Sequence, residues 1–363
     1  MVVTLHVGYV VHPGGPGLPQ THAPGGFAGV DVFFVLSGFL ITGLLLEERH
    51  RRGGVSLRRF YARRAFRLMP ALGLLLLTHL VYGAYEGISL KAEVKTLLSI
   101  TFYSSDVTQS LHLYMPAELS HAWSLAVEEQ FYLVWPSLLL LLLAWRVQVS
   151  RLSTSILPWA FVATLVATNV ARTLTWRAQG YPAAYMMPYC HSDGLIIGCA
   201  LACLNRRQGK LPVRNAGLLG WAGFLGLVGF TFLWTQGPDG AAVYYGGFTL
   251  IALTAAAVMN AVLTTSKWLH GLFSWRPLRA LGTVSYGLYL WHVMILDLIV
   301  QHGFGLGAWP RAIVGLALSA TATVISWYCM EQPFLRLKAR YGPQSAVPSL
   351  AAPAPAKKCR PGA

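Results

Sequence analysis

The sequence predicts an all-α, polytopic membrane protein with about ten transmembrane helices. Of its 363 residues, 55% are hydrophobic and only 11% are charged, whereas a soluble domain carries about 25% charged residues. Long stretches without Lys, Arg, Asp or Glu recur along the chain, and many approach the roughly 20 residues that a helix needs to cross the hydrocarbon core. A soluble core could not bury this much apolar surface.

Ten apolar segments support this count. In chain order they are residues 1–11, 29–46, 71–85, 131–145, 156–171, 186–204, 217–234, 244–263, 281–300 and 312–330. The first is too short to cross a bilayer and has no positive region before it, so it is not a signal peptide. Either this span begins upstream of Met1 or it is a half-membrane element, and we favour a start codon placed too late. Segment 91–103 is amphipathic and predicts a short helix on the outer face, not an eleventh span.

The positive charge predicts an orientation. The net charge is +15, and 23 of the 28 Lys and Arg residues fall in alternate loops. The other five, Arg172 among them, are assigned to the loops between. Cytoplasmic loops are enriched in Lys and Arg, so both termini and the loop from Arg49 to Arg67 are predicted to be cytoplasmic. The basicity therefore indicates topology and no nucleic-acid partner. The excess of Arg over Lys (21 to 7) is typical of a high-GC bacterium, so we expect a bacterial inner (plasma) membrane, in contact with lipid.

The chain divides into a membrane domain over residues 1–340 and a tail over 341–363 that is rich in Pro, Ala and Ser. Such a composition predicts a disordered cytoplasmic tail. The five cysteines have no metal-like spacing, and no phosphate-binding loop or dinucleotide fingerprint is present. We therefore expect no metal site and no permanently bound cofactor.

Ionisable residues at membrane depth are costly, which makes each a functional candidate. His6 lies in the first apolar segment, and Asp31 opens the second. The two segments run antiparallel, so their outer ends meet and His6 can contact Asp31. A histidine held by a carboxylate can take the proton of a hydroxyl nucleophile. The alternative is that His6 merely bonds to a neighbouring helix; His12 is a rival partner in loop-like sequence.

An arginine-rich run, RRFYARRAFRLMP, precedes the third segment. Arg64 and Arg67 lie three residues apart and share a helix face. Guanidinium groups bind phosphates bidentately, and a nucleotide-type donor such as coenzyme A carries several phosphates. The alternative is an ordinary positive anchor on the cytoplasmic side.

Two further blocks carry ionisable groups into apolar segments. In HAWSLAVEEQFYLVWP, Glu128 and Glu129 point about 100° apart on a helix, so at most one is expected to face the interior. In SYGLYLWHV, His292 lies inside a span, where a structural histidine is the simpler interpretation. His79, Asp193 and Asp297 have no companion motif and are interpreted as structural.

Together and in this order, these blocks resemble the acyltransferase-3 family of integral membrane acyltransferases. The family includes O-antigen and other polysaccharide O-acetyltransferases and enzymes that acylate macrolide sugars. The resemblance covers residues 2–336, and its matching blocks are GGFAGVDVFFVLSGFLITGLLLEE (25–48), RRFYARRAFRLMPAL (58–72), HAWSLAVEEQFYLVWP (121–136) and LGTVSYGLYLWHV (281–293). The arginine that the family carries eleven residues before its first-span histidine would lie upstream of Met1.

The resemblance implies a ten-helix enzyme that takes an acyl group, commonly acetyl, from acyl-CoA (acetyl-CoA) and delivers it to a sugar or glycoconjugate hydroxyl. It implies that the first-span histidine, His6, is the general base or acyl-handling residue. The paired arginines would bind acyl-CoA. The positions that match the family's functional residues are His6, Asp31 and Glu128, which the resemblance implies are catalytic, and Arg64 and Arg67, which it implies bind the donor. Further candidates are Glu129, His292 and His12.

A transporter or flippase for a lipid-linked or secreted sugar is the alternative function, since ten spans and a segment broken by Gly and Pro would suit one. Transporters often show internal repeats, and none is visible here. The arginine-rich run also has a ready use in coenzyme A binding. The sequence therefore favours an O-acyltransferase.

Overall fold

The computed structural model describes residues 1–11, 23–148, 153–208, 215–264, 266–303 and 305–339, and within them every regular element is helical. The α-helices are α1 (Val2–Val11), α2 (Ala28–Arg52), α3 (Leu57–Tyr85), α4 (Leu90–Thr101), α5 (Ser105–Ser110), α6 (Ala122–Gln148), α7 (Ser153–Gln179), α8 (Ala183–Met186), α9 (Asp193–Gln208), α10 (Ala216–Leu233), α11 (Phe248–Thr264), α12 (Lys267–Phe273), α13 (Arg276–His302), α14 (Ala308–Ser326) and α15 (Gln332–Ala339). Short 3₁₀ or π turns are η1 (Pro24–Phe27), η2 (Ala117–Leu119), η3 (Gly237–Asp239), η4 (Val243–Gly247) and η5 (Trp327–Glu331).

The all-α membrane architecture is confirmed. Within the described residues, seven helical segments are long and apolar enough to cross a membrane, and α1 and part of α9 are shorter apolar helices. Each of the ten predicted segments falls on a helix, but three of them, on α1, α7 and α9, are outside that set of seven. With ten residues, α1 rises only about 15 Å.

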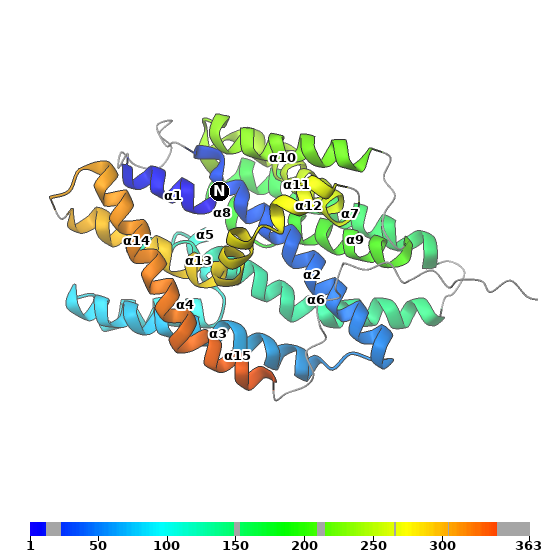
Figure 1. Cartoon of the computed structure of the whole chain (residues 1–363), viewed down its shortest axis with the longest axis horizontal. Coiled ribbons are helices and arrows are strands. Elements are labelled where there is room, and N and C mark those ends of the chain that lie inside the picture. Colours follow the sequence, from blue (N-terminus) through cyan, green and yellow to red (C-terminus); the bar gives the residue numbers. More distant parts are fainter. Residues whose placement is uncertain (12–22, 149–152, 209–214, 265, 304, 340–363) are drawn as a thin grey trace, which may run out of the picture.

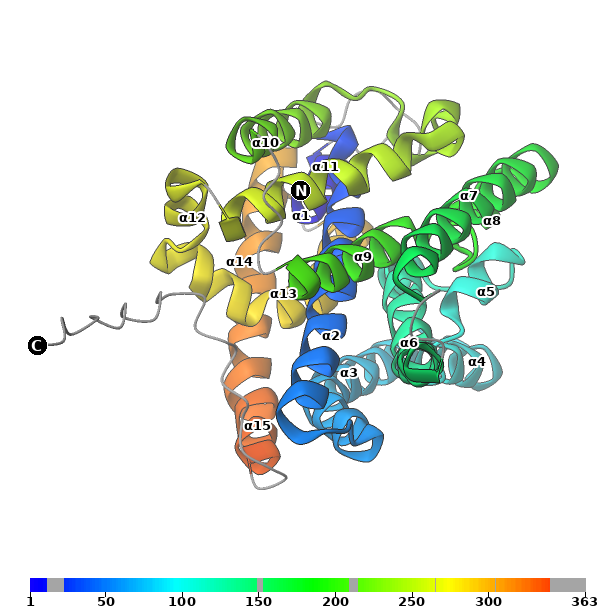
Figure 2. The ribbon, with the colours of Figure 1, turned by 90° about the vertical axis from the view of Figure 1, so that its right-hand side faces the viewer.

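Helix α2 lies in the middle of the bundle, with α9 beside it (Figure 2). Glycines allow the two backbones to approach closely, as in other membrane helix pairs. A Cβ on Gly38 would collide with the carbonyl of Leu195, and one on Gly198 would collide with the carbonyl of Val35. This contact fixes how the start of α9 faces the start of α2.

The remaining helices pack around this pair. Helices α10 and α11 form one flank, and α13 and α14 form another (Figures 1 and 2). The short α1 packs mainly against α13, α14 and the turn η1, and only slightly against α2. The helices that pack against α1 determine which side chains His6 can contact.

Two local expectations can be compared with the structure. Segment 91–103 does form a short helix, α4. Arg172 was assigned to a loop, which is wrong: it lies inside α7 and is fully buried. Its buried carboxylate partner, Asp193, makes this position tolerable. The tail over 341–363 lies outside the described residues.

Candidate active site

Three histidines from distant parts of the chain meet inside the bundle. The ring centroids of His6 on α1 and His292 on α13 lie 5.0 Å apart, and those of His121 and His292 lie 5.8 Å apart. His121 directly precedes α6. His292 and His121 are buried, and His6 is half-buried. This histidine cluster (His6, His121, His292) gathers three proton-transfer groups around a residue that the resemblance implies is functional.

Hydrogen bonds to the backbone select the tautomers of two of these rings. Nδ1 of His6 lies 2.9 Å from the carbonyl oxygen of Val2, and Nδ1 of His292 lies 2.8 Å from that of Tyr289. A carbonyl oxygen can only accept, so Nδ1 donates in both rings. The neutral rings therefore present Nε2 as a lone pair, which is the form that a general base needs.

One face of α6 connects this cluster to charged residues nearer the other end of the helix. His121, Ser124, Glu128 and Tyr132 recur at intervals of three and four residues, so they line a single face. Ser124 bonds to the Tyr289 hydroxyl, which in turn donates to the His121 carbonyl at 2.9 Å. Glu128 accepts hydrogen bonds from Tyr132 and from Ser37 on α2. Along this face, His121 and Glu128 are about 10 Å apart in rise.

Arg64 of α3 binds both glutamates of the EE pair. Its guanidinium lies 2.8 Å from Oε1 of Glu129 and 3.9 Å from Oε1 of Glu128, and it stacks over the Tyr132 ring. The expectation that at most one glutamate faces inward is therefore wrong. Glu128 is buried, Glu129 is half-buried, and the long arginine side chain bridges them.

Arg67, one turn further along α3, has a different environment. It is exposed and makes no ion pair with any described residue. Glu128 and Glu331 lie near enough to attract it electrostatically, but not within ion-pair distance. Glu331 is buried at the end of the π turn η5, where a Cβ on Gly287 of α13 would lie 3.0 Å from its Oε1. Arg67 is thus the arginine of the pair whose guanidinium is available to a ligand.

Asp31 does not contact His6. Its Oδ1 lies 3.0 Å from Nε2 of His191, whose Nδ1 donates to the Tyr185 carbonyl at 2.6 Å, and all of the Asp31 and His191 side chains are buried. This corrects the expected contact between His6 and Asp31. The reason is packing: Asp31 faces the segment that leads into α9, whereas α1 lies against α13 and α14.

A second buried pair stands beside this one. Arg172 of α7 donates to Asp193 at 2.7 Å and to the Cys190 carbonyl at 3.0 Å. Thr249 also donates to Asp193. The charges of Arg172 and Asp193 act on Asp31. The two pairs therefore form one buried polar network at the junction of α2, α7, α9 and α11.

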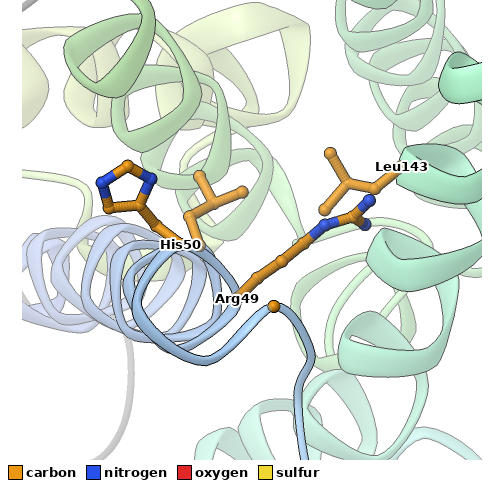
Figure 3. Close-up of a pocket in the computed structure, with 5 residues that line it drawn as sticks. Arg49, His50 and Leu143 are labelled. Carbon is orange, nitrogen blue, oxygen red and sulfur yellow. The ribbon is translucent and has the colours of Figure 1, made fainter.

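A groove of about 450 Å³ lies at the end of α2, opposite its Asp31 end. Figure 3 shows Arg49 extending from α2 towards Leu143 on α6. Arg51 and Arg52 pair with Glu47 and Glu48 respectively, whereas Arg49 makes no ion pair with any described residue.

Several residues of these networks were not predicted as site residues. They are His121, Ser124, Arg172, His191, Tyr289 and Glu331. A signal did exist for some of them, because His121 belongs to the HAWSL block and Arg172 interrupts an otherwise apolar stretch. His12 lies outside the described residues. Within the described residues, no group of three or more His, Cys, Asp or Glu is arranged to hold a metal ion.

A helical bundle of the membrane type, with a histidine cluster and a carboxylate-bound arginine inside it, defines the class of the protein as a polytopic integral membrane protein. The family model described as an acyltransferase domain matches residues 1–331. The chain belongs to this acyltransferase-3 family, and it is a multi-pass bacterial membrane protein.

Relatives in the family carry specific names. The chain is 31% identical over 333 residues to the peptidoglycan O-acetyltransferase OatA of Listeria monocytogenes, covering 86% of this chain and 51% of that protein. It is 30% identical over 325 residues to the O-acetyltransferase OatA of Staphylococcus aureus, covering 85% of this chain and 52% of that protein. The chain thus spans about half the length of these relatives. No solved structure gives a significant match.

Proposed function

We propose that this protein transfers an acetyl group from acetyl-CoA to a hydroxyl of a cell-wall glycan of the peptidoglycan type. The proposed topology has ten spans with both termini in the cytoplasm, so that the arginine-rich end of α3 faces the cytoplasmic donor. The names of the relatives support acetyl as the acyl group and peptidoglycan as the acceptor, in preference to a macrolide.

One observation carries the proposal: a single face of α6 runs from the charged cluster around Arg64 to the histidine cluster around His6. A donor whose phosphates are bound at the charged end can extend its thioester along this face towards the histidines. The donor and the base therefore occupy two ends of one polar path through an apolar bundle.

The chemistry needs few groups. The acceptor hydroxyl oxygen attacks the thioester carbonyl, a C–O bond forms, and the C–S bond breaks. Nε2 of His6 takes the hydroxyl proton and returns it to the leaving thiolate, so the reaction is balanced without any other reactant. A transient acetyl group on His6 is a second route to the same products, since the imidazole lone pair can itself attack the thioester.

The donor end offers free positive charge. Arg67 is exposed, and Arg49 lies further towards the same end of the bundle on α2. Guanidinium groups at both positions would bind the phosphates of coenzyme A. Arg64, in contrast, is already engaged by two carboxylates, so its proposed role is to hold α3 against α6.

The test uses membranes from cells that express the chain, supplied with radiolabelled acetyl-CoA and cell-wall glycan. We expect label to reach the glycan with the native protein and to fall by about 10²–10⁴-fold with His6→Ala, the usual contribution of a general base. The matched control is His270→Ala, an exposed histidine on α12. Equal label with native protein and His6→Ala would remove His6 from the mechanism. No label with folded native protein would contradict the proposed function.

A further inference from the structure

His121 differs from the other two rings of the histidine cluster in its hydrogen bonds. In His6 and His292, Nδ1 donates to a backbone carbonyl. Both ring nitrogens of His121, in contrast, are buried and have no hydrogen-bond partner among the described residues. The carbonyl of Leu290 is close enough to interact with the ring but does not form a hydrogen bond with it. A buried polar group without a partner is rare in native proteins and requires an explanation.

The hydrogen bonds divide the cluster into acceptors and one donor. A neutral imidazole has one N–H and one lone pair. Because the backbone uses the N–H of His6 and of His292, each of these rings offers only the lone pair of its Nε2. The proton of His121 can lie on either nitrogen, since no partner fixes it. His121 is therefore the ring of the three that can donate a hydrogen bond while it is neutral.

The neighbouring hydroxyl and indole groups do not replace this donor. The Tyr289 hydroxyl donates its one proton to the His121 carbonyl at 2.9 Å, so Ser124 is the donor in the bond that joins the two hydroxyls. The indole N–H of Trp291 is buried without a partner, but its side chain packs among apolar residues such as Leu72 and Leu75 of α3. Consecutive residues of a helix point about 100° apart, so this indole diverges from His292.

The position of His121 suits a donor to an anion. Its ring centroid lies 5.8 Å from that of His292 and 5.3 Å from that of Tyr289, and the His292 centroid lies 5.0 Å from that of His6. His121 directly precedes α6, so the positive end of the helix dipole lies beside its ring. This dipole disfavours a protonated imidazole and favours a negative charge next to it.

We propose that His121 is a catalytic residue whose neutral ring donates its N–H to the oxyanion of the tetrahedral intermediate in acyl transfer. When the acceptor oxygen bonds to the thioester carbon, the π pair of the carbonyl moves onto the carbonyl oxygen, which His121 then binds. When that pair returns, the C–S bond breaks and the thiolate takes the proton that His6 had accepted. His121 keeps its own proton throughout. This inference rests on the proposed function, since it adds a residue to the same site.

The test compares three variants with the native protein. His121→Phe keeps a ring and removes both nitrogens, His121→Gln restores an N–H donor, and His270→Phe, at an exposed position on α12, is the matched control. The first measurement is kcat and KM for acetyl-CoA in the transfer assay with cell-wall glycan. The second is the Kd of acetonyl-CoA and of trifluoroacetonyl-CoA for the purified protein. Both analogues carry a CH₂ group between sulfur and carbonyl, so no acyl group is transferred. The trifluoromethyl ketone adds water to form a tetrahedral hydrate that mimics the intermediate, whereas acetonyl-CoA stays a planar ketone.

We expect His121→Phe to lower kcat by about 10²–10³-fold with KM for acetyl-CoA unchanged, the effect of losing one oxyanion donor. His121→Gln recovers part of this loss, and His270→Phe changes neither constant. The native protein binds trifluoroacetonyl-CoA more tightly than acetonyl-CoA. His121→Phe removes that preference without changing the Kd of acetonyl-CoA, whereas loss of a merely structural histidine would weaken both analogues alike.

Three results would overturn the inference. They are an unchanged kcat in His121→Phe, a preference for trifluoroacetonyl-CoA that survives this substitution, and no binding of either analogue to the native protein. The two proposals also fail separately. A preference that depends on His121, without any transfer of acetyl to the glycan, would support the inference and contradict the proposed function. Transfer at the native rate in His121→Phe would support the function and contradict the inference.

Discussion

Oδ1 of Asp31 lies 3.0 Å from Nε2 of His191, which belongs to the segment that leads into α9. Because Nδ1 of His191 donates to the Tyr185 carbonyl, a single further proton is shared between His191 and Asp31. The pair also stacks on Trp123, whose ring centroid is 5.6 Å from that of His191. Trp123 is buried on α6, so the dyad packs against this helix.

The first prediction concerns this dyad. Asp31→Leu and His191→Phe should each lower acetyl transfer by roughly tenfold or more, because each leaves the other group buried without its partner. The double variant should be no worse than the poorer single variant, since both remove the same interaction. Rates are measured in membranes at matched protein levels. Losses that multiply would instead mean that Asp31 acts independently of His191.

The second prediction separates the two arginines of α3. Arg67→Gln should raise KM for acetyl-CoA by about tenfold with little change in kcat, because an exposed guanidinium without an ion pair is removed. Arg64→Gln should lower kcat and the thermal stability together, because Glu128 and Glu129 lose their partner. Steady-state kinetics and a melting curve in detergent distinguish the two effects. Identical kinetic profiles for the two variants would count against separate roles.

The sequence predicted the helices and the residue types of the site better than their partners. Long stretches with few or no charged residues located helices at all ten predicted segments, seven of which are long and apolar enough to cross a membrane. The cost of ionisable groups at membrane depth marked His6, Asp31, Glu128 and His292 as candidates. Both of these arguments depend only on local composition.

Partners could not be predicted, because they depend on which helices touch. Asp31 and His191 are 160 residues apart in the sequence. They form a hydrogen bond because the glycines of α2 and α9 permit the two helices to approach closely. Arg172 can be buried inside α7 because Asp193, at the start of α9, forms an ion pair with it. Each contact joins two different helical segments, and no single-sequence pattern specifies that contact.

The third prediction tests the buried ion pair of Arg172 and Asp193. Arg172→Leu should destabilise the protein by about 3–5 kcal/mol, because a fully buried carboxylate remains without its cation. The double variant Arg172→Leu, Asp193→Leu should recover much of that loss. Melting temperatures in detergent provide the comparison. A double variant less stable than Arg172→Leu would contradict this explanation. It would show that Asp193 stabilises the bundle in a way that does not depend on neutralising Arg172.

The fourth prediction concerns His79, which joins α3 to α4 and η2. Nδ1 lies 2.7 Å from Oε1 of Glu93, Nε2 lies 3.2 Å from Oε1 of Glu118, and all three side chains are buried. An ionised carboxylate can only accept a hydrogen bond, so two ionised partners require the ring to donate from both nitrogens as a cation. His79→Phe would leave two buried carboxylates close together, and we expect a loss of about 3 kcal/mol.

The control for His79 is His302→Phe. His302 pairs with Glu86 at 3.7 Å, but these side chains are 38% and 35% exposed, and an exposed ion pair contributes only about 0–1 kcal/mol. If both histidine variants melt within a degree of the native protein, the buried carboxylates have taken up protons. Replacing Glu93 or Glu118 by Gln in the His79→Phe background would then change nothing, whereas unpaired carboxylates would be relieved by that replacement and stability would rise.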